Sequence, residues 1–135
     1  MKIIFLRLGA IFALLAVLFG AFGAHSLEKI VSPDELHTFE VGVRYQLYHA
    51  FALLITGLLT YWRPNRYLTI AGWLFMGGIL LFSGSLYGLV LDESLGLSLR
   101  WMGPITPIGG MLFIFGWGAL LRATFVKVKE GETVH

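Results

Sequence analysis

The segment Leu8–Leu27, LGAIFALLAVLFGAFGAHSL, decides the fold class of this chain. It holds twenty residues without aspartate, glutamate, lysine or arginine, and Arg7 directly precedes it. About twenty mostly apolar residues are needed for a helix to cross the hydrocarbon core of a bilayer. The segment shows no strand-like alternation of polar and apolar residues. It therefore predicts a membrane-spanning helix.

The composition of the whole chain agrees with this interpretation. Of the 135 residues, 57% are hydrophobic and 13% charged, and the mean hydropathy is +0.79. Soluble domains are nearer half apolar and a quarter charged. The net charge of +2 comes without a basic run, which excludes a nucleic-acid partner. The absence of cysteine excludes thiol nucleophiles, disulfides and cysteine-held metal sites.

Three further uncharged runs complete the expected architecture. Together with 8–27, the spans are predicted at about 45–62, 67–91 and 104–121. The backbone must satisfy its own hydrogen bonds in lipid, so each span is expected to be helical. We expect an all-α integral membrane four-helix bundle, with residues 1–125 as a single transmembrane domain. Residues 126–135 are expected to form a disordered cytoplasmic tail.

Charge predicts how the four spans are oriented. Cytoplasmic loops collect lysine and arginine. Seven of the ten basic residues lie in the N-terminal segment, in the loop between the second and third spans, or after the fourth span: Lys2, Arg7, Arg63, Arg66, Arg122, Lys127 and Lys129. We therefore expect a multi-pass protein of the plasma (inner) membrane with both termini in the cytoplasm.

The first outer loop is expected to hold its own helix. Ser32-Pro33-Asp34-Glu35 is typical of a capping box with proline at the first helical position. Leu36, Phe39 and Val43 then share one face. The pattern predicts a short amphipathic helix that ends at about Val43 and bends near Gly42 into the second span.

Small residues mark close helix contacts. In the first span they recur at steps of 4, 3, 4 and 4, at Gly9, Ala13, Ala16, Gly20 and Ala24. Small faces let helix backbones approach closely in lipid. The small face of the first span packs either against another helix of this chain or against a second protein chain. The expected partners are therefore the lipid bilayer and, besides it, either further copies in a homo-oligomer or a larger membrane complex.

Polar side chains gather near the outer ends of the predicted spans. Counted at 1.5 Å per residue from those ends, eight of them occupy the outer half of the membrane. Polar groups should face the bundle because lipid offers no partners. The expected outer polar cluster comprises His25, Arg44, Tyr45, His49, Ser83, Ser85, Tyr87 and Thr106. His49 is interpreted either as a structural histidine or as a contact for a proton, metal or ligand.

Four segments resemble a known family. They are 20–25 (GAFGAH), 44–50 (RYQLYHA), 82–87 (FSGSLY) and 103–110 (GPITPIGG). They are similar to the YgdD-like bacterial inner-membrane proteins, a family of unknown function. The resemblance covers nearly the whole chain and implies a small four-helix membrane protein. It implies no activity.

Three functions remain open at this point. The first is a structural or accessory membrane subunit without catalysis, and the second is a small oligomeric transporter or channel whose mouth is the outer cluster. The third is a haem- or metal-binding protein, because His25 and His49 are the candidate ligands at similar expected depth. No cofactor is implied by the residues themselves. An enzyme is not expected, because no catalytic triad, intramembrane carboxylate pair or phosphate loop is present.

Overall fold

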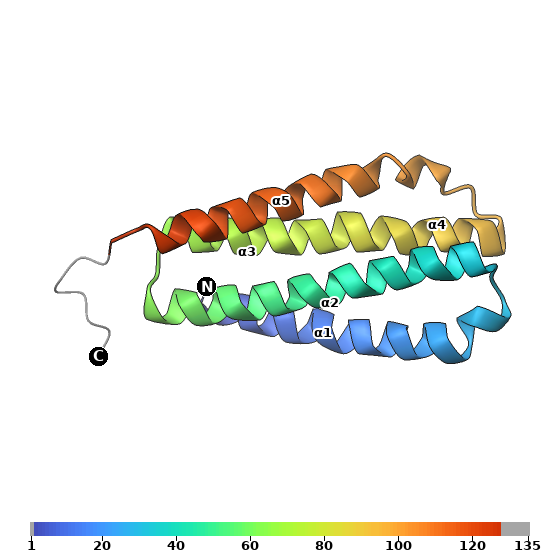
Figure 1. Ribbon diagram of the computed structural model, residues 1–135, viewed down its shortest axis with the longest axis horizontal. Helices are drawn as coiled ribbons and strands as arrows, with labels where there is room; N and C mark the ends of the chain where they lie inside the picture. The colour runs from blue at the N-terminus through green and yellow to red at the C-terminus, as the bar shows by residue number, and fades with distance from the viewer. Residues whose placement is uncertain (1, 128–135) are drawn as a thin grey trace.

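The computed structural model describes residues 2–127, and these form an all-α protein. Its helices are α1 (Lys2–His25), α2 (Pro33–Trp62), α3 (Arg66–Gly78), α4 (Gly84–Leu95) and α5 (Ile105–Thr124). A π-helical turn, Ile79–Ser83, joins α3 to α4, and 3₁₀ turns occupy Leu27–Lys29 and Arg100–Met102. Figure 1 shows α3 and α4 as one continuous rod, with α1, α2 and α5 running alongside it. The expected all-α class is confirmed, and of the predicted tail, residues 128–135 lie outside the described residues.

The helices run between two ends of the molecule, here called the far end and the near end. The far end carries the loops at 26–32 and 96–104, and the near end carries the loop at 63–65 and the start of α1 (Figure 1). At the near end, the Asn65 side chain accepts hydrogen bonds from the backbone N–H groups of Tyr67 and Leu68. The first N–H groups of a helix have no partner within it, and Asn65 accepts two of them. This N-cap allows α3 to begin directly after the short loop that follows α2.

Three segments are long and apolar enough to cross a membrane: Ile3–Lys29, Arg66–Leu95 and Arg100–Thr124. The second predicted span, 45–62, is not among them, because Gln46, His49 and two threonines lower its hydropathy. Large aliphatic side chains such as Leu14, Val17 and Ile114 are more than half exposed. Exposure of this kind along whole helices suits a lipid environment.

The short helix expected in the first loop is not confirmed as a separate element, because it does not end at about Val43. Its start is as expected, since Ser32 caps the helix and its side chain accepts a hydrogen bond from the N–H of Glu35. The helix then continues without a break through Gly42 to Trp62. A Cβ on Gly42 would lie only 2.7 Å from the Tyr87 ring, so glycine here permits a close contact with α4. The charge at Arg44 ends the apolar run, but it does not end the helix.

Glycines set against phenylalanine rings hold the core together. A side chain at Gly72 would collide with the Phe5 ring, and one at Gly78 would collide with the ring of Phe113. The central core of buried residues spans α1, α2, α3, the π turn and α5: Phe5, Ala52, Leu53, Ala71, Phe75, Ile79 and Phe113. A smaller core of Leu27, Phe39 and Val90 lies at the far end.

The small face of α1 packs inside the chain. A Cβ on Gly9 would lie 2.9 Å from the carbonyl oxygen of Ala50, and Ala16 is buried. Gly20 faces the Val43 side chain. The small face was expected to pack either within the chain or against another copy. In the structure it packs within the chain, against α2.

Candidate functional site

Gln46 joins three helices by its side-chain amide. Its Nε2 donates to the carbonyl oxygen of Phe12 on α1 at 2.8 Å, and its Oε1 accepts from the hydroxyl of Tyr87 on α4 at 2.7 Å. The residue is only 2% exposed. A buried amide is tolerated where both of its ends are hydrogen-bonded. We call Gln46, Tyr87 and the Phe12 carbonyl the Gln46 junction.

Two serines make further contacts beside this junction. Ser83, in the π turn, donates to the carbonyl oxygen of Gly42 at 2.7 Å. Ser85 shares a hydrogen bond with the Thr106 hydroxyl of α5 and also donates to the carbonyl oxygen of Phe82. Each hydroxyl therefore finds its partner on the protein, and each ties α4 or the π turn to another helix.

His49 makes a different connection, from α2 to α5. Its Nδ1 lies 2.7 Å from the carbonyl oxygen of Tyr45, one turn earlier in the same helix, and its Nε2 accepts from the indole N–H of Trp117 at 3.0 Å. The Tyr45 carbonyl needs a donor, so Nδ1 carries a proton, and the Trp117 N–H needs an acceptor, so Nε2 does not. These two partners therefore indicate that the His49 imidazole is neutral and protonated at Nδ1. We call His49 and Trp117 the His49 junction.

Aromatic rings enclose the His49 junction. The imidazole stacks on Phe113 with ring centroids 3.5 Å apart and planes 10° apart. Phe75 stands edge-on to Trp117, and the Tyr45 ring packs against Phe82. His49 is thus buried by apolar rings except at its two nitrogen contacts.

The eight expected cluster residues do not form one site. Tyr87 belongs to the Gln46 junction, Ser83 lies beside it, Ser85 pairs with Thr106, and Tyr45 supplies a carbonyl to His49. His25 and Arg44 are both exposed and join neither junction. Arg44 instead lines a surface pocket of about 300 Å³ with Glu40.

His25 and His49 lie at different levels of the molecule. Gly9 of α1 lies beside Ala50, and His25 is sixteen residues beyond Gly9, about 24 Å further along the helix. A shared haem or metal would need both ligands within a few ångströms of it. The expected common depth fails because α2 begins at Pro33 and not at Tyr45. His49 therefore lies about 24 Å from the start of α2, just past the middle of the helix.

Neither Gln46 nor Trp117 was among the site residues expected from the sequence. Gln46 is the only glutamine in the chain and stands within an uncharged span, where an amide without a partner is costly. That signal could have identified it. Its partner on α1 could not have been found, because it is a backbone carbonyl in the apolar middle of that helix.

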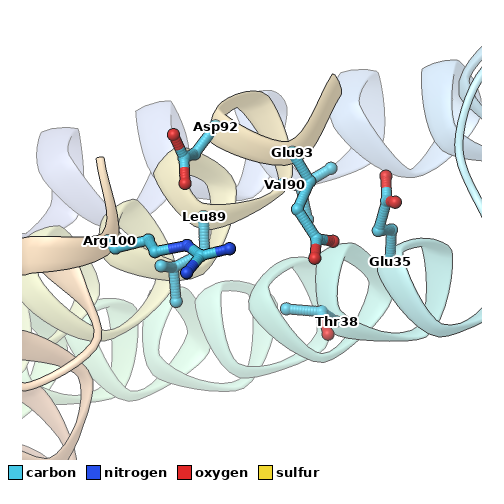
Figure 2. Close-up of a pocket in the computed structure, with 7 residues that line it drawn as sticks. All are labelled: Glu35, Thr38, Leu89, Val90, Asp92, Glu93 and Arg100. Atoms are coloured by element: carbon cyan, nitrogen blue, oxygen red, sulfur yellow. The ribbon is translucent and has the colours of Figure 1, made fainter. Parts of the chain in front are cut away.

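A pocket of about 310 Å³ lies at the far end, between the first turns of α2 and the end of α4. Figure 2 shows the guanidinium of Arg100 on one side of it and the carboxylates of Glu93 and Glu35 on the other. Asp92 also lines the pocket, but its carboxylate accepts a hydrogen bond from the N–H of Leu99 at 2.8 Å. Among the described residues, no group of three or more histidine and carboxylate side chains is placed to hold a metal ion.

Known proteins resemble this chain over most of its length. Residues 19–110 match the family model described as a protein of unknown function, DUF423. A UPF0382 membrane protein of Staphylococcus aureus is 47% identical over 122 residues, which cover 90% of this chain and 95% of that protein. The UPF0382 membrane protein YwdK of Bacillus subtilis is 44% identical over 115 residues, covering 84% and 89% of the two chains. No solved structure matches.

These relatives confirm that the chain belongs to an uncharacterised family of membrane proteins, but they identify it as DUF423 and UPF0382 and do not confirm the YgdD-like name. Both proteins are matched along nearly their whole length, so the likeness concerns the complete arrangement of helices and not one segment. The polar junctions and the far-end pocket described above are therefore features of a DUF423 chain. The protein belongs to the DUF423 family, and the two relatives described above are UPF0382 membrane proteins.

Proposed function

We propose that this protein is a small four-span subunit of the plasma membrane that supports a larger membrane complex and catalyses no reaction. The observation that carries the proposal is the complete internal pairing of its buried polar groups. Among the described residues, no buried side-chain nitrogen or oxygen lacks a hydrogen-bond partner. A transport path or a catalytic centre needs polar groups that can exchange a protein partner for a substrate.

The exposed apolar faces of α1 and α5 support the same proposal. Leu14 and Val17 project from α1, while Ile114 and Phe115 project from α5, and all four are more than half exposed. The small face of α1 is already used by α2. Outward contacts of this protein therefore depend on large aliphatic and aromatic side chains, which can face either lipid or a partner helix.

The proposal includes α2 as the fourth span, with the near end in the cytoplasm. Its polar side chains are paired within the protein, which removes the cost of placing them at membrane depth. The basic residues Arg7, Arg63, Arg66 and Arg122 belong to the near end, as cytoplasmic segments require.

A topology experiment tests this arrangement. The chain lacks cysteine, so a single cysteine at Asn65 gives a unique label. In intact cells we expect an impermeant maleimide to leave Asn65→Cys unlabelled and to label Ser98→Cys in the opposite loop. Labelling of position 65 from outside would overturn the orientation.

Two measurements test the accessory role. In mildly solubilised native membranes, we expect the protein to migrate on a native gel with a mass well above that of its own dimer. The purified protein in sealed liposomes should not raise the flux of protons or small ions above that of empty liposomes. Migration only as a monomer or dimer, together with a flux abolished by His49→Phe, would instead establish the transporter.

A further inference from the structure

The far-end pocket in Figure 2 has opposite charges at its two sides. The Arg100 guanidinium lies at one side and the carboxylates of Glu93 and Glu35 lie at the other, and Leu89 and Val90 also line the pocket. Arg100 and Glu93 are exposed, so both charges remain available to a molecule that enters the pocket. A ligand that matches this arrangement carries an anion and a cation a few atoms apart.

Both charged sides are held in position by the fold. The loop that carries Arg100 is fixed to α4 by the Asp92 carboxylate, which accepts the N–H of Leu99 and is itself almost fully buried. Met102, two residues after Arg100, packs so closely on Gly88 that a side chain there would collide with its sulfur. On the other side, the Ser94 hydroxyl donates to Oε2 of Glu35 at 3.4 Å. The loop that carries Arg100 and the side chain of Glu35 are therefore held by the fold, while the exposed side chains of Arg100 and Glu93 project from it into the pocket.

The surroundings of the pocket indicate that the ligand comes from the membrane. It lies where the apolar segment Arg66–Leu95 ends and the segment Arg100–Thr124 begins. Leu95, Leu97 and Trp101 around this junction are all more than half exposed. Exposed tryptophan beside aliphatic side chains is typical of the headgroup level of a bilayer. A soluble ligand would not need such an apolar margin.

We propose that this pocket binds the zwitterionic headgroup of a phospholipid, with the phosphate on Arg100 and the ammonium group on Glu93 and Glu35. Guanidinium groups suit phosphate oxygens because their N–H groups form a planar fork. A volume of about 310 Å³ is at the small end of ligand pockets, which fits a headgroup and not a whole lipid. The site requires a membrane-embedded protein, but it does not depend on the accessory role proposed above.

The test uses the purified full-length protein in detergent, with lipid retention read by native mass spectrometry. Phosphatidylethanolamine carries phosphate and ammonium, whereas phosphatidylglycerol carries phosphate alone. We expect the unmodified protein to retain the first about threefold better, the ratio given by one partly exposed ion pair. Equal retention of the two lipids would overturn the proposal.

Two substitutions give opposite selectivity patterns. Arg100→Gln should lower retention of both lipids, whereas Glu93→Gln should remove the preference for phosphatidylethanolamine and leave phosphatidylglycerol unchanged. Arg100→Lys keeps the cation and should restore much of the binding lost in Arg100→Gln. Glu28→Gln and Lys29→Gln are matched controls, because these residues are also exposed at the far end but do not line the pocket. Wild-type retention by Arg100→Gln would contradict the assignment.

A competition arm separates the membrane from a soluble source. Free phosphoethanolamine has the same charged groups without acyl chains. We expect a large excess of it to be needed to displace phosphatidylethanolamine. Displacement at equal concentration would show that the pocket takes soluble zwitterions and would overturn the lipid assignment. The accessory role would be untouched by that result, because its test is migration on a native gel.

Discussion

Gln46 and His49 stand one turn apart on the same helix, yet they connect it to its neighbours in different ways. Gln46 directs both ends of its amide outward, to the backbone of α1 and to Tyr87 on α4. His49 directs one nitrogen back to its own helix at Tyr45 and only the other to α5 at Trp117. The rest of its contact with α5 is ring stacking on Phe113.

The difference indicates that α2 holds its neighbours by two kinds of force. The Gln46 junction has two interhelical hydrogen bonds and no substitute if they are lost, because lipid supplies no donors or acceptors. The His49 junction has one such bond and a broad apolar contact that survives without it. We expect the first to respond strongly to any change of chemistry and the second to respond mainly to a change of shape.

The largest effect is expected from Gln46→Ala. The substitution removes both interhelical bonds, leaves the buried hydroxyl of Tyr87 without its acceptor and opens a small cavity. We expect the free energy of unfolding to fall by about 2–4 kcal/mol. Unfolding with dodecyl sulfate in mixed micelles, followed by far-UV circular dichroism, measures it.

Tyr48→Phe is a matched control for loss of a polar group on the same helix. Tyr48 is 52% exposed, so removal of its hydroxyl should change the stability by less than about 0.5 kcal/mol. If Gln46→Ala destabilised the protein no more than Tyr48→Phe, the Gln46 junction would not hold the three helices together.

A smaller effect is expected from His49→Phe. Phenylalanine keeps the stack on Phe113, but it cannot accept the N–H of Trp117. We expect a loss of about 1 kcal/mol, because one interhelical hydrogen bond is lost and the N–H of Trp117 is left without its acceptor. The same unfolding assay measures it, and a loss as large as that of Gln46→Ala would remove the distinction between the two junctions.

The third prediction isolates one bond of the Gln46 junction. In a double-mutant cycle of Gln46→Leu and Tyr87→Phe, we expect a coupling energy of about 0.6 kcal/mol. The double variant leaves neither partner unpaired, so it should be more stable than the sum of the single losses implies. Strict additivity would show that the 2.7 Å contact contributes nothing to stability.

The smallest effect is expected from Thr56→Val. Thr56 is fully buried, but its hydroxyl donates to the carbonyl oxygen of Ala52 within α2. Because this bond joins no second helix, its loss should change the unfolding free energy by no more than about 0.5 kcal/mol. A loss above 1 kcal/mol would show that bonds within α2 matter as much as those between helices.

Much of the helical architecture could be predicted because it follows from local chemistry. The Ser32-Pro33-Asp34-Glu35 start of α2 and the turn at Pro64-Asn65 are each specified by adjacent residues. The apolar runs locate three of the rods within a few residues. The length of α2 was missed because the predicted span was begun after the charged Arg44. A charge marks the edge of an apolar segment, but it does not end a helix.

The candidate site was harder to predict, because its members are joined by contacts between distant segments. Counting depth from Tyr45 placed His49 near His25, whereas helix packing sets Ala50 against Gly9. Trp117 has the residue type of an interface anchor, and only the crossing of α2 and α5 shows that its indole meets His49. The spacing of residues along the sequence predicts neither the packing of Ala50 against Gly9 nor the contact between Trp117 and His49.

The π turn at Ile79–Ser83 has a consequence for how changes in chain length are tolerated. An added residue in a helix rotates everything after it by about 100°, so α3 and α4 are two helices of different phase on one axis. Removal of one residue from this turn would keep the rod but rotate Ser85, Tyr87 and Gly88 away from their partners. The number of residues between Phe75 and Tyr87 is therefore fixed by the contacts at both ends of the rod.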